Sequence, residues 1–265
     1  MKTTRWIIIV SLTLCFFACY KESLTIKKGP FRVLVYNEVG AQGYSHSSRS
    51  AGVSMIRKLG ERYNWETEED GDGSTFDSFD QLSQYAVVVF CNTSGNGILN
   101  KEQQGNFEKF IQSGGGFVGI HAATDTYRDR SWSWYNELVG AIIQSDPNHT
   151  NAGHQNTMDV LNRNHPSTER MESEWEKREE YYYWEKNGGY LASGTIPLLR
   201  VRETQDGNGQ VNSYDAPRPI SWYRAYDGGR SFYTALGHSS DNYSQDSTFI
   251  YHIAGAIRWA AAGQN

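Results

Sequence analysis

The chain has 265 residues, enough for one large domain or two small ones. Its formal net charge is −5 and it has no cluster of Lys and Arg, which argues against nucleic acid as a partner. Aromatic residues make up 14% of the chain, with 17 Tyr and 8 Trp. Their flat apolar faces and polar groups suit both sugar binding and ordinary core packing.

The first 18 residues have the pattern of a signal peptide. Two basic residues precede an apolar run, 6–18, that is too short to span a bilayer. Cys19 then follows a small residue, as in a bacterial lipobox, where cleavage leaves a lipid-modified N-terminal Cys. We expect export to the cell envelope, a membrane anchor on Cys19 and a tether over residues 19–29. Phe16 replaces the usual aliphatic residue of a lipobox, so a soluble secreted form is the alternative.

Strand and helix patterns alternate along the first part of the remaining chain. The apolar run 86–91 is typical of a parallel strand that is covered on both faces. Asn100, with Gln103 three residues later, predicts a helix N-cap with a capping box. In chain order we expect a strand at 31–36, a helix at 49–63, a strand at 65–69, a short helix at 76–85, a strand at 86–91, a helix from Asn100 to about 112 and a strand at 116–122. This order predicts a doubly wound, mainly parallel α/β sheet with flanking helices.

After Pro147 the pattern becomes richer in strands. We expect strands at 157–161, 180–184, 196–201, 219–226 and 231–235, followed by a helix at 246–261. No linker separates this part from the first, so we predict a single domain over residues 30–263.

The loops that follow the first parallel strands are expected to meet at one edge of the sheet. Ligands of such sheets bind beyond the carboxyl ends of the strands. We therefore expect the loops after Tyr36, Cys91 and His121 to share one binding site. The substrate-binding candidates in the first two of these loops are Tyr44, His46, Asn92 and Thr93.

His121 occupies a position where related folds display a nucleophile. The stretch GGGFVGIHAATDT, residues 114–126, is a buried strand that ends in a sharp turn of small residues. A Ser or Cys nucleophile is excluded at this turn, and Cys91 ends a different strand without a His–Asp pair near it in sequence. An imidazole there can act as a general base, bind a metal or hydrogen bond to a substrate. Asp125 is placed either to orient this imidazole or to cap the next helix.

Several other residues are candidates for the same site. In the segment 179–184, EEYYYW, alternation places Glu180 beside aromatic side chains, where desolvation would raise its pKa as an acid catalyst needs; a solvated Glu at a strand edge is the alternative. Trp134 offers an aromatic platform, and Arg230 suits either a substrate group or a structural ion pair. His238 follows a predicted strand.

The sequence has no compact metal-binding motif. His-x-x-x-His and Cys-x-x-Cys spacings are absent, and His149 and His154 lie five residues apart in a polar loop. A divalent metal would have to be assembled across the fold, with His46, His121 and His238 as its candidate ligands.

These segments together resemble the trehalose-utilisation (ThuA-like) family. The matching segments are GYSHSS (43–48), VVVFCNTSGN (87–96), LNKEQQGNFEKFIQSGGGFVGIHAATDT (99–126), WSWYNELVGA (132–141), NHPST (164–168), EEYYYW (179–184), PISWYRAYDGGRSFYTALGH (219–238) and IAGAIRWAA (253–261). The resemblance implies a class I glutamine-amidotransferase-like, flavodoxin-like fold without the amidotransferase nucleophile. It also implies a link to sugar catabolism, sugar oxidoreductases and 3-keto-glycosides.

The resemblance places His46, His121, Glu180 and His238 at the polar positions expected along the edge of the sheet. One departure concerns the segment after the aromatic helix, where many members have His-Pro and this chain has Asp146-Pro147. A role for a histidine at that place is therefore not predicted for this chain.

We expect a carbohydrate-processing enzyme, a hydrolase, lyase or isomerase, that acts on a glycoside or keto-sugar. His121 and Glu180 are its predicted acid–base pair, and His46 and His238 are expected to bind substrate or metal. Two alternatives are a non-catalytic carbohydrate-binding protein and a partner of a sugar oxidoreductase.

Overall fold

The computed structural model describes residues 24–185, 191–202 and 218–263. The predicted signal peptide and the lipid anchor on Cys19 lie outside these ranges. Among the helices in the described ranges, none is both long and apolar enough to cross a membrane.

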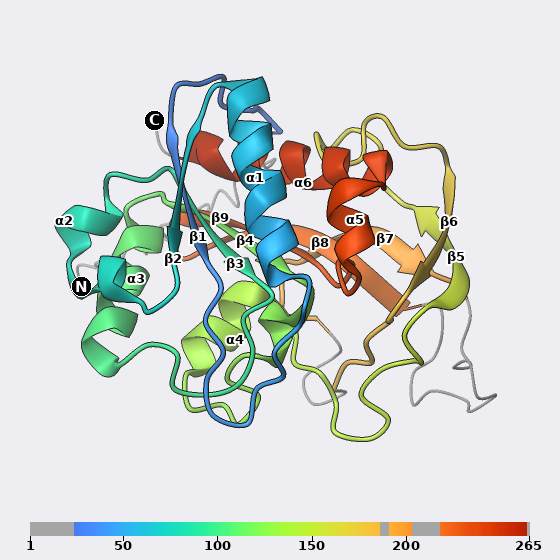
Figure 1. The fold of residues 1–265 in the computed structure, drawn as a ribbon, viewed down its shortest axis with the longest axis horizontal. Helices are drawn as coiled ribbons and strands as arrows, with labels where there is room; N and C mark the ends of the chain where they lie inside the picture. The colour runs from blue at the N-terminus through green and yellow to red at the C-terminus, as the bar shows by residue number, and fades with distance from the viewer. Residues whose placement is uncertain (1–23, 186–190, 203–217, 264–265) are drawn as a thin grey trace, which may run out of the picture.

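Nine strands in the described residues form one mixed sheet in the order β2-β1-β3-β4-β9-β8-β7-β5-β6 (Figure 1). The first five strands in this order are parallel: β2 (Glu66–Asp70), β1 (Arg32–Tyr36), β3 (Val87–Cys91), β4 (Gly116–Ile120) and β9 (Gly229–Thr234). The remaining strands pair antiparallel: β8 (Arg218–Tyr226), β7 (Ile196–Val201), β5 (His154–Val160) and β6 (Glu174–Glu179). The prediction of a single α/β domain with flanking helices is confirmed, and its sheet combines a parallel half of five strands with an antiparallel half.

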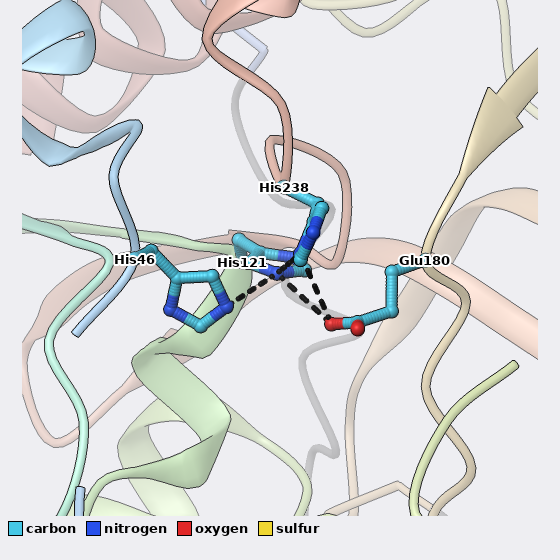
Figure 2. Close-up of side chains that lie close together, drawn as sticks. All are labelled: His46, His121, Glu180 and His238. Carbon is cyan, nitrogen blue, oxygen red and sulfur yellow. Dashed lines mark hydrogen bonds and ion pairs between the residues drawn. The ribbon is translucent and has the colours of Figure 1, made fainter. Parts of the chain in front are cut away.

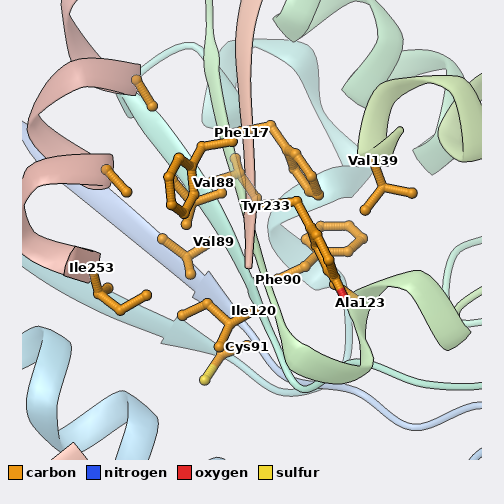
Figure 3. Close-up of a cluster of buried hydrophobic side chains, with 14 of the residues drawn as sticks. Val88, Val89, Phe90, Cys91, Phe117, Ile120, Ala123, Val139, Tyr233 and Ile253 are labelled. Atoms are coloured by element: carbon orange, nitrogen blue, oxygen red, sulfur yellow. The ribbon is translucent and has the colours of Figure 1, made fainter. Parts of the chain in front are cut away.

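Helices flank the parallel strands. The helices are α1 (Arg49–Tyr63), α2 (Phe79–Leu82), α3 (Lys101–Gln112), α4 (Ser133–Val139), α5 (Ser240–Ser244) and α6 (Ser247–Ala260), and short 3-10 turns lie at η1 (Ser74–Asp77), η2 (His121–Asp125) and η3 (Ala261–Gly263). Figure 3 shows Ile253 of α6 and Val139 of α4 on opposite sides of the strands. The amidotransferase-like winding of these elements stays a prediction.

Local sequence signals account for the first half of the fold. Helix α1 has the predicted bounds, and the capping box of α3 forms because Asn100 accepts from the Gln103 N–H while the Gln103 side chain accepts from the Asn100 N–H. Every residue of β3 and β4 is buried. Phe90 of β3, labelled in Figure 3, stacks on Phe107 and on Tyr135, each with ring centroids 5.4 Å apart. Such burial explains the continuous apolar pattern of the strand.

The predicted strand at 180–184 is wrong. The strand lies upstream as β6, a polar edge strand in which Lys177 and Glu179 are buried. Tyr182 and Trp184 make only isolated bridges, to His149 and Ile143. Aromatic alternation is typical of strands, but here it reflects burial of these rings beneath a loop rather than ladder pairing.

Candidate functional site

Four side chains that are distant in the sequence meet beyond the carboxyl ends of the parallel strands. His46 comes from the loop after β1, His121 directly follows β4, His238 follows β9, and Glu180 directly follows β6. Figure 2 shows these side chains pointing toward one another. One potential ligand atom from each lies within 4.8 Å of all the others. We call these four residues the His–Glu cluster.

His121 is the buried centre of this cluster. Its φ of 49° lies in the left-handed region, which a non-glycine residue adopts only where the surrounding structure enforces it. Its Nδ1 lies 2.6 Å from the Ala235 carbonyl oxygen. Because a carbonyl only accepts, Nδ1 carries the hydrogen, and neutral His121 presents the lone pair of Nε2 to the cluster.

The Nε2 atom of His121 has four polar neighbours. It lies 3.2 Å from His46 Nε2, 3.3 Å from His238 Nδ1 and 3.4 Å from Glu180 Oε2. The Tyr182 hydroxyl lies 2.9 Å away, and the Tyr182 ring stacks on the His121 ring with centroids 4.7 Å apart. One aromatic nitrogen cannot form separate hydrogen bonds with all four groups, so the cluster has more donors and acceptors than it can pair internally.

Glu180 carries the negative charge of the cluster. Its Oε2 lies 3.3 Å from His238 Nδ1, and its Oε1 lies 3.2 Å from His149 Nδ1. Burial raises the pKa of Glu180, but the neighbouring imidazoles of His121 and His238 outweigh that effect and hold the pKa well below its usual range. The expectation of a raised pKa is therefore wrong, because this carboxylate is ionised rather than ready to donate a proton.

The two outer imidazoles of the cluster have opposite shifts. The hydrogen bond to Glu180 raises the pKa of His238 despite partial burial. Burial, followed by the nearby His121 and His238, lowers the pKa of His46 to about 3. The cluster therefore combines an ionised carboxylate, an imidazole that favours the protonated form and an imidazole that stays neutral.

A cavity of about 610 Å³ opens over the cluster, within the usual range for small-molecule sites. His46, Glu180, His238 and Tyr182 line its floor, and Tyr44 lies at its wall with 65% of its surface exposed. Its other polar lining residues are Gln42, Asp125, Arg128, Asn148, His149 and Asn151.

Some predicted substrate-binding residues are buried beside the cavity rather than exposed in it. The Asn92 amide donates to the Tyr243 hydroxyl at 2.8 Å, and the Thr93 hydroxyl lies 2.9 Å from that of Thr126. Asp125 does line the cavity, but it bonds to Ser94 and to Arg128. It therefore neither orients His121 nor caps α4.

Trp134 and Arg230 lie at the opposite edge of the sheet, which corrects their assignment to the site. Arg230 pairs in register with Gly116, the first residue of β4, whereas His121 follows the last residue of that strand. Its guanidinium donates to the Trp259 carbonyl at 2.8 Å, and the Trp134 indole donates to Asp227 at 2.9 Å. Both side chains therefore have structural partners.

His149, Tyr182 and Glu179 are site residues that the sequence analysis did not identify. His149 reaches Glu180 from the segment after Asp146-Pro147, so a histidine does enter the cavity from this region. The buried Glu179 carboxylate accepts from the N–H groups of Gly237 and His238, at 3.0 and 3.1 Å, and so holds the loop that carries His238. The adjacent pair Glu179 and Glu180 was the available sequence signal for Glu179. It does not show which of the two carboxylates is structural and which lines the cavity.

Cys91, the free cysteine of the described residues, does not supply a nucleophile to the cavity. Cys91 is fully buried, and burial raises the pKa of its thiol to about 12. His165 is buried between Tyr223 and Trp259, outside the cavity. Within the described residues, the side chains able to hold a metal ion in a shared site are those of the His–Glu cluster.

The fold and this site define an α/β protein with an imidazole–carboxylate cluster in a small-molecule cavity. Residues 32–260 match the model of the ThuA family, described as trehalose utilisation, and the chain belongs to that family. A comparison with curated proteins gives no significant match.

Solved structures show the same fold. A ThuA-like protein from Bacteroides uniformis is 22% identical, with a TM-score of 0.70 over 89% of this chain and 94% of that one. A ThuA-like protein from Parabacteroides merdae is 17% identical, with a TM-score of 0.62 over 89% and 91%. A protein from Salmonella typhimurium described as cytoplasmic is 12% identical, with a TM-score of 0.60 over 86% and 99%.

Proposed function

We propose that this protein processes carbohydrates, acting on a glycoside or a keto-sugar by proton transfer at the His–Glu cluster. The observation that carries the proposal is the convergence of His121, Glu180 and His238 below an open cavity. The family description, trehalose utilisation, supports a sugar as the substrate class.

The protonation pattern supports a role for each of these side chains. A keto group acidifies the neighbouring C–H bond, and the lone pair of His121 Nε2 can accept that proton. Glu180, held ionised, would stabilise the resulting imidazolium at 3.4 Å. The C–H electron pair then forms a carbon–carbon double bond to the neighbouring anomeric carbon, from which the glycosidic oxygen leaves with its bonding pair, and His238 supplies the proton that the oxygen takes up. This sequence describes a lyase reaction that needs no covalent nucleophile.

The cavity wall supports recognition of a sugar. The exposed ring of Tyr44 can stack on the apolar face of a pyranose. Arg128 and Asp125, paired at 3.0 Å, offer donors and acceptors for hydroxyl groups on the same wall. Such pairing of an aromatic face with fixed polar groups is what orients a small polyol.

The test is turnover of a panel of 3-keto-glycosides and their parent glycosides, measured as release of the aglycone or sugar. We expect turnover of at least one keto-glycoside, and its loss in His121→Ala and Glu180→Gln. Full turnover in both variants would overturn the assignment. Tight sugar binding without any product would instead indicate a carbohydrate-binding protein.

We also propose that the protein is exported and anchored through a lipid on Cys19. The basic residues, apolar run and Cys19 of the N-terminal segment support this. Mass spectrometry of the protein from its native membrane fraction should find a diacylglyceryl Cys19 as the first residue. An N-terminus that still begins at Met1 would contradict both export and anchoring.

A further inference from the structure

We propose that the His–Glu cluster binds one divalent transition-metal ion of the zinc type, with three imidazole nitrogens and one carboxylate oxygen as ligands. This deepens the proposed function, since it assigns a cofactor to the same cavity. It rests on the geometry of His46, His121, Glu180 and His238 and on the hydrogen atoms that this geometry permits.

The distances between the potential ligand atoms fit such an ion. Nε2 of His121 lies 3.2 Å from His46 Nε2, 3.3 Å from His238 Nδ1 and 3.4 Å from Glu180 Oε2, and the last two atoms are 3.3 Å apart. Zinc bonds of about 2.0–2.1 Å in a tetrahedral arrangement place neighbouring ligand atoms roughly 3.3–3.4 Å apart. These four distances agree with this spacing within about 0.2 Å, and the other two, from His46 to Glu180 and to His238, lie within 4.8 Å.

The hydrogen atoms give an independent argument. The Ala235 carbonyl requires a hydrogen on His121 Nδ1, so in the neutral ring Nε2 is an acceptor aimed at the other three side chains. The Glu180 carboxylate is also an acceptor. A cation at the centre would satisfy these converging lone pairs at once, in place of the Tyr182 hydroxyl that lies 2.9 Å from His121 Nε2.

The surroundings resemble the supporting hydrogen bonds of metal ligands. The Ala235 carbonyl fixes the tautomer of His121, and His149 lies 3.2 Å from Glu180 Oε1, the oxygen directed away from His121. The Glu179 carboxylate fixes the backbone that carries His238. Each of these contacts holds a ligand side chain without occupying its ligand atom.

The donor set selects the class of metal. Three imidazoles and one carboxylate suit Zn²⁺, Co²⁺, Mn²⁺ or Fe²⁺, whereas Ca²⁺ and Mg²⁺ prefer oxygen ligands. His46, Glu180 and His238 line the cavity, so a further coordination position would face it. There a bound ion would polarise a carbonyl or acidify a water molecule. Because His121 and Glu180 would both be ligands, the bound ion would take over their part in the reaction, and His149 would remain as the cavity imidazole outside the ligand set.

The experiment uses the purified full chain, stripped of metal and titrated with Co²⁺, whose visible absorption reports four- or five-coordinate binding. We expect one Co²⁺ per chain, displaced by Zn²⁺. His121→Ala and His238→Ala should each weaken binding by more than about 100-fold, beyond the roughly 10–100-fold typical of losing a supporting residue such as His149. His154→Gln, which removes an imidazole outside the cluster, is the matched control and should bind as wild type does.

Three results would overturn the metal site: no stoichiometric Co²⁺ band, wild-type affinity in His238→Ala, or equal weakening in His154→Gln. If circular dichroism shows that His121→Ala does not fold, His238→Ala alone decides, because its side chain is 26% exposed on a loop. If turnover persists after complete removal of metal, the proposed metal site is refuted and the proposed function is unaffected. Metal binding without turnover of any glycoside would support the metal and overturn the proposed function.

Discussion

The two edges of the parallel strands both carry aromatic and charged residues, but they use them differently. At the amino edge, Arg230 and Trp134 donate to the Trp259 carbonyl and to Asp227. At the carboxyl edge, the imidazoles of His46, His121 and His238 face one another around Glu180 below a cavity. Residue type is therefore a weaker indicator of function than whether neighbouring groups of the fold already satisfy a side chain.

The largest expected effect on kcat/KM distinguishes the roles of the two adjacent carboxylates, Glu179 and Glu180. Glu180→Gln removes the charge below the cavity and should lower kcat/KM on an active keto-glycoside by about 10³-fold, within the range of a lost acid–base group. Glu179→Gln should lower kcat/KM by only about tenfold but cost about 3 kcal/mol of stability, because charge-assisted hydrogen bonds to the Gly237 and His238 N–H groups are lost. Steady-state kinetics and urea unfolding measure both quantities, and equal kinetic losses would contradict the distinction.

His165 tests the acid sensitivity of a buried imidazole outside the cavity. Burial, followed by His252 and Arg230, lowers its pKa to about 3. Below pH 6.5 the unfolded chain binds a proton here that the folded chain does not, so stability falls as the pH falls. When the pH falls from 7.5 to 5, the free energy of unfolding should decrease by about 2 kcal/mol less in His165→Gln than in wild type. Urea unfolding at both pH values measures this, with His154→Gln as the control; parallel losses in all three proteins would refute it.

Tyr182→Phe should have a smaller effect at the carboxyl edge. The variant keeps the ring stacked on His121 and removes the hydroxyl that lies 2.9 Å from Nε2. One hydrogen bond of about 1 kcal/mol predicts a loss of about tenfold or less in kcat/KM. Kinetics across pH provide the measurement, and a loss as large as that of Glu180→Gln would mean that the hydroxyl itself transfers a proton.

The smallest effect on activity is expected at the amino edge. Trp134→Phe and Arg230→Lys weaken hydrogen bonds to Asp227 and to the Trp259 carbonyl, so melting temperatures should fall by a few degrees, which for a domain of this size corresponds to about 1 kcal/mol. Their kcat/KM should stay within about twofold of wild type, as for substitutions far from the reacting groups. A loss of more than tenfold in kcat/KM in a folded variant would show that the substituted residue does belong to the functional site.

The sequence was most informative where structure depends on neighbours in the chain. The bounds of α1, the capping box of α3 and the buried strand β4 followed from helical spacing, a local cap and a continuous apolar run. His121 at the end of that strand was identified for the same reason. The position of His46 beside it followed from the general rule for the carboxyl ends of parallel strands, whereas that of His238 followed from the family resemblance.

The antiparallel half was less predictable because strand pairing depends on distant partners. The aromatic pattern at 180–184 indicated a strand, but the ladder formed at Glu174–Glu179, where β5 pairs with it. This places Glu180 just beyond the end of β6, where it meets His121 and His149.

The sequence by itself determined the α/β class, the main elements of the first half and the absence of a nucleophile at the end of β4, because each depends on residue type and local spacing. Only the tertiary structure decided which edge holds Arg230 and Trp134, which of two adjacent carboxylates enters the cavity, and that His149 joins it. These outcomes depend on register and on contacts between residues distant in the chain, which local spacing does not encode.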